Sequence, residues 1–288
     1  MNYLFYPGCA LEASSPHYYK SCRLSCEKVG IQLDELEDWT CCGATAYVGT
    51  DEVKATAYSA RNLALAERAG ATDLVTACNA CYITLRKSDK FFTNETMRHD
   101  ASEALQAAGL AYDGTVRVRH IAEVLLNDVG PARIKESITT PLDGLKVACY
   151  HGCLLTRPFT DIGDPEQPDI MDRVLAPTGA EMVDFPATAK CCGGMLMTTR
   201  REVGLALVYE ILSCARAMKA DVVAVACPLC SVNLEAYQDA IGQVYDWDRP
   251  MPIVLFTQLL ALAQGASAED VGLDQCMIRP EFLMERFA

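Results

Sequence analysis

The hydrophobic positions along the chain predict short strands that alternate with helices. Apolar runs at Tyr3–Tyr6 and Asp73–Ala77 are typical of buried strands. Between them, Glu52–Ala69 carries apolar side chains at helical spacing and is followed by Gly70, which predicts a helix that ends there. Strands that alternate with helices favour an α/β fold with a parallel sheet.

The same order of elements occurs a second time. Lys146–Cys149 and Asp221–Ala226 are predicted strands, and Arg201–Lys219 is the helix between them. A last strand and helix close each half, at 116–118 with 120–127 and at 253–255 with 257–263. We therefore predict two pseudo-symmetric α/β halves from an internal duplication, 1–140 and 141–288, each with a small, mostly parallel sheet. The join is expected within 129–145, and 158–168 is expected to be a loop.

Cysteines follow the predicted strands in both halves. The chain has 15 cysteines in 288 residues. Each half contains a Gly-Cys, then a Cys-Cys-Gly, then a Cys-x-x-Cys, in the same order and with similar gaps. The cysteines of these motifs are Cys9, Cys41, Cys42, Cys78 and Cys81 in the first half, and Cys153, Cys191, Cys192, Cys227 and Cys230 in the second. Because such sheets place their sites at the carboxyl ends of strands, we expect one site in each half.

Five thiols per half limit the kind of site. Thiolates are soft ligands that select zinc, copper(I) or iron–sulfur clusters. A structural zinc site takes four ligands, commonly as two Cys-x-x-Cys pairs, and each half has only one such pair. An ordinary [4Fe–4S] cluster takes four cysteines from a compact run that is absent here. The sequence therefore favours an unusual cluster, with zinc in one half as the alternative. Glycines beside the cysteines permit a close backbone approach to such a ligand.

Charge and composition disfavour several kinds of partner. The formal net charge is −13, which disfavours binding to nucleic acid or to an anionic membrane surface. A membrane-spanning helix needs about 20 apolar residues, whereas the longest apolar run, Ile253–Ala263, has 11. The first residues lack the basic and apolar regions of a signal peptide, so we expect a cytoplasmic protein without membrane insertion. Reduced thiols in that compartment argue against a disulfide framework.

The two cysteine patterns resemble the two cysteine-rich CCG domains of the heterodisulfide reductase B-subunit family. The resemblance extends from Tyr6 to the helix after Pro252, and the segments Asp38–Gly43 and Cys153–Pro158 share it. It implies that each half binds one noncubane [4Fe–4S] cluster through its five cysteines and that a disulfide substrate is split at these clusters. It also implies partners: a ferredoxin-like iron–sulfur subunit and a flavin-containing subunit. Related domains occur in sulfur-oxidising complexes, atypical succinate dehydrogenases and lactate or glycolate oxidases, so the physiological disulfide stays open.

Several residues outside the motifs are weaker candidates. His151 lies two positions before Cys153 and is a candidate hydrogen-bond or proton donor to a leaving thiolate. Lys190 and Arg157 are candidates for holding an anionic substrate or stabilising a reduced cluster. A local structural role or a solvated charge is the competing interpretation for each. The remaining cysteines are interpreted as packing residues: Cys22 and Cys26, which share a helix face, and Cys149, Cys214 and Cys276.

The sequence leaves four functions to compare. The first is the catalytic subunit of a heterodisulfide-reductase-like complex, which reduces or forms a disulfide of small thiols. The second is an iron–sulfur subunit that only transfers electrons within a larger oxidoreductase. A dithiol oxidoreductase using the two Cys-x-x-Cys motifs, or a zinc-only protein, would leave the Cys-Cys-Gly motifs unexplained. No Gly-x-Gly-x-x-Gly follows a strand, so electrons are expected to come from a partner.

Overall fold

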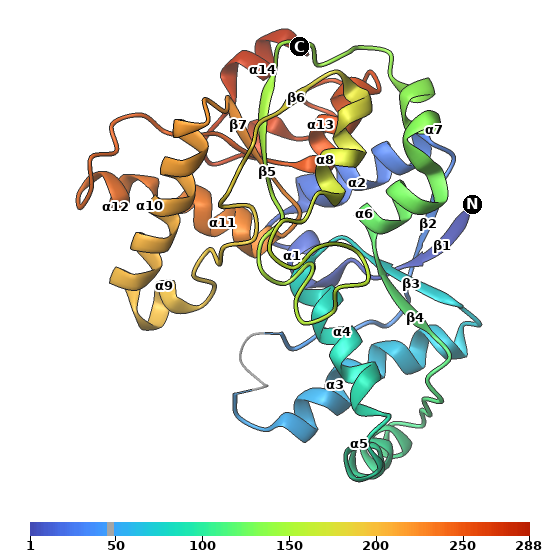
Figure 1. The fold of residues 1–288 in the computed structure, drawn as a ribbon. Helices are drawn as coiled ribbons and strands as arrows, with labels where there is room; N and C mark the ends of the chain where they lie inside the picture. The colour runs from blue at the N-terminus through green and yellow to red at the C-terminus, as the bar shows by residue number, and fades with distance from the viewer. Residues whose placement is uncertain (45–48) are drawn as a thin grey trace. The chain divides into compact units, whose positions relative to one another are not determined.

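The structure is a computed structural model that describes residues 1–44 and 49–288. In these residues the chain forms two four-stranded sheets and divides into two compact units. Unit 1 comprises residues 1–14 and 31–121, and unit 2 comprises residues 15–30 and 122–288 (Figure 1). Each unit contains one of the sheets, and every strand pair in both sheets is parallel.

The sheet of unit 1 has the strand order β2-β1-β3-β4. Its strands are β1 (Asn2–Phe5), β2 (Gln32–Glu35), β3 (Asp73–Thr76) and β4 (Arg117–His120). β3 lies in the interior, and its three apolar or small residues Leu74, Val75 and Thr76 are fully buried. The helices of this unit are α1 (Gly8–Glu12), α3 (Glu52–Arg68), α4 (Asn79–Phe91) and α5 (Glu95–Ala107).

The sheet of unit 2 has the equivalent order β6-β5-β7-β8. Its strands are β5 (Lys146–Tyr150), β6 (Glu181–Met182), β7 (Val222–Val225) and β8 (Ile253–Leu255). In both sheets the first strand along the chain lies between the second and the third. This shared topology, with the matching helix pair α3 and α10 (Arg201–Ala217), confirms the predicted α/β duplication.

The remaining helices lie in unit 2, with the first residue of α6 at the boundary. They are α2 (Pro16–Lys28), α6 (Ile121–Val124), the π-helix Leu125–Val129, α7 (Gly130–Ser137), α8 (Ile170–Leu175), α9 (Leu196–Thr199), α11 (Pro228–Ala236), α12 (Gln238–Gly242), α13 (Phe256–Ala263), α14 (Glu281–Arg286) and the 3-10 turns Ala176–Thr178 and Leu273–Gln275. The expected loop 158–168 contains no helix or strand, whereas the expected join contains α7.

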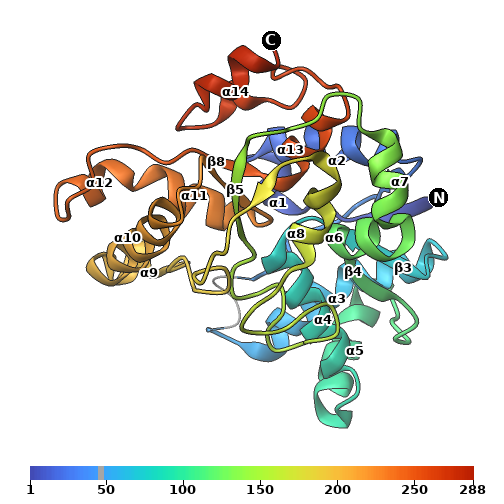
Figure 2. The same ribbon diagram turned by 45° about the horizontal axis from the view of Figure 1, so that its top comes forward.

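Helix α2 precedes β2 in the chain but packs within unit 2. Its Ser21 hydroxyl lies 2.8 Å from the hydroxyl of Thr257 on α13. The Tyr18 ring makes an edge contact with Phe256, with 6.5 Å between ring centroids. Both views of the ribbon show α2 beside α13 (Figures 1 and 2). The sequence repeat and the compact units therefore divide the chain differently, because residues 15–30 belong to the first repeat in sequence but pack in unit 2.

Two strands escaped the sequence reasoning because little of each is apolar and buried. β2 has the sequence Gln-Leu-Asp-Glu and buries only Leu33. β6 has two residues, neither of them buried. Both are edge strands, β2 beside β1 and β6 beside β5, so one edge of each has no neighbouring strand.

Candidate metal centres

The five motif cysteines of the first half come together in unit 1. Cys9 follows β1, Cys41 and Cys42 follow β2, and Cys78 and Cys81 follow β3 at the start of α4. The Sγ atoms of Cys9 and Cys41 are 3.6 Å apart, and those of Cys42 and Cys81 are 3.4 Å apart. Cys42, Cys78 and Cys81 are buried, while Cys9 is exposed. Parallel strands end at one edge of the sheet, which is why cysteines far apart in sequence meet there.

The five motif cysteines of the second half repeat this arrangement in unit 2. Cys153 follows β5, Cys191 and Cys192 follow β6, and Cys227 and Cys230 follow β7 at the start of α11. The Sγ atoms of Cys192 and Cys230 are 3.4 Å apart. As in unit 1, the second cysteine of the Cys-Cys pair and both cysteines of Cys-x-x-Cys are buried.

A buried tyrosine supports each set. The Tyr6 hydroxyl donates to the carbonyl oxygen of Thr40 at 2.7 Å, and the Tyr150 hydroxyl donates to that of Lys190 at 2.6 Å. The pKa of both tyrosines is raised well above the usual value, mainly by burial and to a smaller extent by the charges of the neighbouring thiols. Both hydroxyls therefore stay protonated and act as donors. Each bond fixes the residue before the Cys-Cys pair. Sequence reasoning missed this role, although Tyr-x-Gly-Cys recurs in both halves.

Glycine lets the backbone approach the sulfur atoms at Gly8. Its φ is +71°, and a Cβ built there would lie 2.9 Å from the Sγ atom of Cys81. Gly193 in the second half has a φ of +90°, and a Cβ there would lie 3.2 Å from the Cα atom of Gly204 on α10. Both positions therefore require the absent side chain as well as the left-handed backbone.

Contacts between thiols separate their pKa values. Hydrogen bonds from Cys42 and Cys9 lower the pKa of Cys41 to about 2, and the same contact raises that of Cys9. In the second half, the contact with Cys153 lowers the pKa of Cys191 to about 6, and the charge of Arg157 acts in the same direction. Each set thus includes a thiol that is held as the thiolate, the form that binds metals.

The donor sets fit iron–sulfur chemistry. Each provides five soft sulfur donors, three of them buried, and in unit 1 Gly8 leaves room beside the Sγ atom of Cys81. Among the described residues, no three or more His, Cys, Asp or Glu side chains are arranged around a single metal ion.

Asn233 on α11 contacts the loop around Cys192. Its Nδ2 atom donates to the carbonyl oxygens of Gly194 at 3.0 Å and Cys192 at 3.3 Å, and it lies 3.6 Å from the Sγ atom of Cys192. The corresponding position in α4 is Thr84, whose hydroxyl donates to Ala80 within its own helix. Hydrogen bonds to ligand sulfur tune a bound cluster, so the two sites have different surroundings.

The three weaker candidates all lie in unit 2 close to its cysteines. His151 is fully buried; its Nδ1 atom is 2.7 Å from the Thr188 hydroxyl, and its Nε2 atom accepts from the Met171 amide at 3.0 Å. Arg157 donates to the carbonyl oxygen of Ala189 at 2.5 Å. Lys190 pairs with Glu210. Both nitrogens of His151 are thus engaged, and the two cations flank the loop that ends at Cys191.

The five other cysteines lie outside both sets. Cys22 and Cys26 are fully buried in α2 and contact each other. Cys149 lies 3.6 Å from the sulfur of Met182. Cys276 is buried and Cys214 is half-buried.

Comparisons with known proteins agree with the two sites. The cysteine-rich domain CCG matches residues 3–86 and 147–235, which include all ten motif cysteines. The B subunit of the ferredoxin/F420H2-dependent CoB-CoM heterodisulfide reductase of Methanosarcina acetivorans is 33% identical, covering 96% of this chain and 94% of that protein. The 8-methylmenaquinol:fumarate reductase membrane anchor subunit of Wolinella succinogenes is 29% identical, covering 96% of each.

A solved structure supports the fold. A hypothetical protein from Helicobacter pylori superposes with a TM-score of 0.75 and 17% identity, covering 95% of this chain and 51% of that one. None of the helices within 1–44 and 49–288 is both long and apolar enough to span a membrane. With two cysteine-rich domains and a relative of 33% identity along almost its whole length, the chain belongs to the heterodisulfide reductase B-subunit family of iron–sulfur proteins.

Proposed function

We propose that this chain is the catalytic subunit of a heterodisulfide-reductase-like complex that reduces, or forms, a disulfide of small thiols. In this proposal each half holds one noncubane [4Fe–4S] cluster through its five motif cysteines. The observation that carries the proposal is the completeness of both sets: in each, the same three strand ends deliver the same five thiols. Donors beyond the four of an ordinary cluster favour an unusual one.

Two sites suit the chemistry of a disulfide. Cleavage of a disulfide consumes two electrons and yields two thiolates, and bound clusters supply electrons one at a time. The chain's own residues hold the sites in place: Tyr6 and Tyr150 fix the loops before the Cys-Cys pairs, and Asn233 fixes the loop around Cys192.

Arg157 favours an anionic thiol as the substrate of the second site. Its guanidinium is close enough to Cys191 to lower the pKa of that thiol. The Nε atom of Arg157 is buried and has no hydrogen-bond partner among the described residues. The accessible Nη1 atom lies 3.7 Å from Glu166, an exposed carboxylate that a carboxylate, sulfonate or phosphate on the substrate would replace.

The electron donors are further subunits in this proposal. We expect a ferredoxin-like iron–sulfur subunit and a flavin-containing subunit, because several relatives are named as subunits and the chain has no dinucleotide motif. Fifteen free thiols suit the reducing cytoplasm, which we propose as the location.

One relative favours a second function. The protein from Wolinella succinogenes is named as a subunit of a fumarate reductase, in which the reducible substrate is not a disulfide. The alternative is therefore an electron-transfer subunit that contains the same clusters but has no disulfide substrate of its own.

A thiol-release assay distinguishes these functions. The complex is purified without oxygen, analysed for iron and zinc, and supplied with reduced viologen and a series of symmetric and mixed disulfides. The proposal expects two thiols per disulfide, a preference for anionic disulfides that Arg157→Gln weakens, and no turnover in Cys42→Ser. Reduction of the bound clusters by the viologen, without thiol release from any disulfide, would support the electron-transfer alternative, and zinc in place of iron would exclude both.

A further inference from the structure

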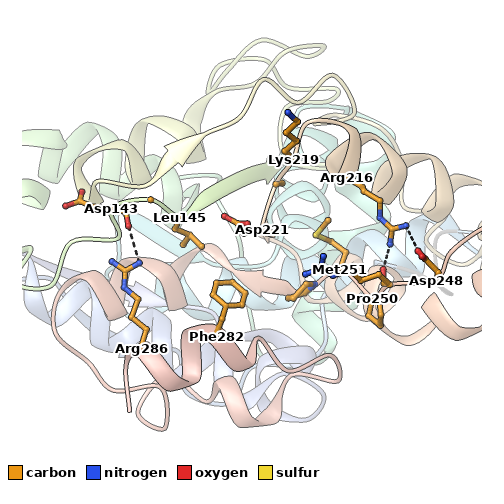
Figure 3. A pocket seen from close by; sticks show the side chains of 14 residues that line it. Asp143, Leu145, Arg216, Lys219, Asp221, Asp248, Pro250, Met251, Phe282 and Arg286 are labelled. Carbon is orange, nitrogen blue, oxygen red and sulfur yellow. Dashed lines mark hydrogen bonds and ion pairs between the residues drawn. The ribbon is translucent and has the colours of Figure 1, made fainter.

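A cavity lies in unit 2 at the opposite edge of its sheet from the cysteines. Its volume is about 700 Å³, and its walls are the starting ends of β5, β7 and β8, the end of α10, and α14. Figure 3 shows Phe282 between Arg286 on one side and Arg216 on the other. Cavities of this size suit small organic molecules.

The internal duplication provides a reference for this edge. Helices α3 and α10 have 17 residues each, and the same offset of 149 positions separates their starts and their ends. Glu67 of α3 therefore corresponds to Arg216 of α10. Glu67 accepts hydrogen bonds from the amides of Asp113 and Thr115, before β4. Arg216 bonds to the loop before β8, at the carboxylate of Asp248 and the carbonyl of Arg249. In both halves this helix position is hydrogen-bonded to the loop before the last strand, through a carboxylate in unit 1 and through a guanidinium in unit 2.

A second replacement in α10 adds another cation. Lys219 corresponds to Gly70, and both adopt a left-handed backbone, with φ of +61° and +76°. Glycine adopts this conformation freely, whereas lysine is strained in it. The helix end needs no side-chain cap, because the Met218 amide donates to Cys214 and the Ala220 amide donates to Ala215. The Lys219 ammonium makes no ion pair or hydrogen bond with the described residues, and Lys219 is one of the residues that line the cavity.

The cations around the cavity are only partly neutralised. The cations are Arg216, Lys219, Arg249 and Arg286, and the carboxylates are Asp143, Asp221 and Asp248. Arg216 is held rigidly, with the Trp247 ring at 3.6 Å and Asp248 at 3.2 Å. Arg286 donates to the backbone carbonyls of Asp143 and Pro141 rather than to a carboxylate. Asp221 accepts from the Lys146 amide.

We propose that this cavity binds a small organic anion. A phosphate or carboxylate group of the ligand is held at the end formed by Lys219, Arg216 and Arg249, and an apolar ring of the ligand rests on Phe282. The Phe282 side chain lines the cavity and is 43% exposed, so its ring is accessible to a ligand. The inference is independent of the proposed disulfide chemistry, since it uses none of the cysteines.

Binding of phenyl phosphate and of benzoate to the anaerobically purified protein tests the proposal by calorimetry. These probes share the ring and distinguish phosphate from carboxylate as the preferred group. We expect saturable binding that Lys219→Gly weakens by about tenfold or more, the loss typical of one charge-assisted hydrogen bond. Glycine suits the backbone at 219, so this variant keeps or gains stability and cannot lose binding by unfolding. Lys87→Ala, which removes an exposed lysine from α4 in unit 1, serves as the control of equal net charge.

Phe282→Ala tests the second half of the proposal. The wild type is expected to bind phenyl phosphate more tightly than inorganic phosphate, and the variant is expected to bind the two equally. Absence of saturable binding, or equal affinity in the wild type and Lys219→Gly, would overturn the proposal. Lys219-dependent binding of a polyglutamate peptide without binding of either probe would also overturn it, and would assign the cavity to an acidic protein segment.

Discussion

Tyr6 and Tyr150 make the same hydrogen bond in the two halves, each from its hydroxyl to the carbonyl oxygen directly before a Cys-Cys pair. The acceptors are Thr40 and Lys190, and both bonds are short, at 2.7 and 2.6 Å. Tyr6 directly follows β1 and Tyr150 is the last residue of β5. Each bond therefore connects two of the three segments that supply a set of cysteines. In each half, one side chain thereby holds two cysteine-bearing loops in a fixed relative position.

Tyr150→Phe is expected to loosen the second site while leaving the first intact. The ring still fills the core, but the Lys190 carbonyl loses its donor, at a cost of about 1 kcal/mol. Iron should be lost faster on exposure to a chelator, from the second half alone. Tyr6→Phe should do the same for the first half.

Tyr245→Phe is the control, because the Tyr245 ring stacks on Tyr209 with 4.3 Å between ring centroids and its hydroxyl makes no hydrogen bond in the described part of the chain. Equal rates of iron loss in Tyr150→Phe, Tyr245→Phe and the wild type would show that the hydroxyl has no role in holding the loop.

Gly8→Ala is expected to damage the first site more than its backbone strain alone explains. A left-handed alanine costs roughly 1 kcal/mol, and its Cβ would in addition meet the Sγ atom of Cys81 at 2.9 Å. Gly70→Ala is the matched control, since Gly70 has φ of +76° but nothing within 4 Å of a Cβ. Both variants should lose stability in thermal unfolding, Gly8→Ala more than Gly70→Ala, and only Gly8→Ala should lose iron. Full iron content in Gly8→Ala would mean that Cys81 moves freely.

The sequence was sufficient for the repeat, for the strands with buried apolar runs and for the grouping of the cysteines, because these depend on local pattern and strand direction. The packing of α2 was not predictable. The spacing of Cys22 and Cys26 marks a buried face but does not specify its partner, and that face packs in unit 2. Asn233 was missed for a related reason: its amide reaches the Cys192 loop only after α11 has packed beside it.

Glu235→Gln is expected to stabilise the protein at high pH. Burial raises the pKa of this carboxyl to about 7 from 4.5, while its hydrogen bond from the Met277 amide acts in the opposite direction. Between these two values the folded state binds more protons than the unfolded state, so stability falls as pH rises. Glutamine keeps an acceptor for Met277 and has no charge to bury.

The gain should be on the order of 2–3 kcal/mol at pH 8 and near zero at pH 4. Urea unfolding at both pH values measures it, with Glu202→Gln as the control, because Glu202 is exposed on α10. A Glu235→Gln variant with the same pH dependence as the wild type would show that Glu235 is ionised without cost in the fold.

Replacement of cysteine by serine separates the ligands from the packing residues. Cys42→Ser and Cys192→Ser should each lose iron from their own half and abolish disulfide turnover, because serine is a harder and less readily deprotonated ligand. Cys22→Ser should keep both clusters and cost about 1 kcal/mol of stability, since Cys22 is fully buried in α2 and is interpreted as a packing residue. Iron content and the absorption spectrum after anaerobic purification decide the comparison. If Cys22→Ser loses iron while Cys42→Ser retains it, the first site must instead be built around Cys22 and Cys26.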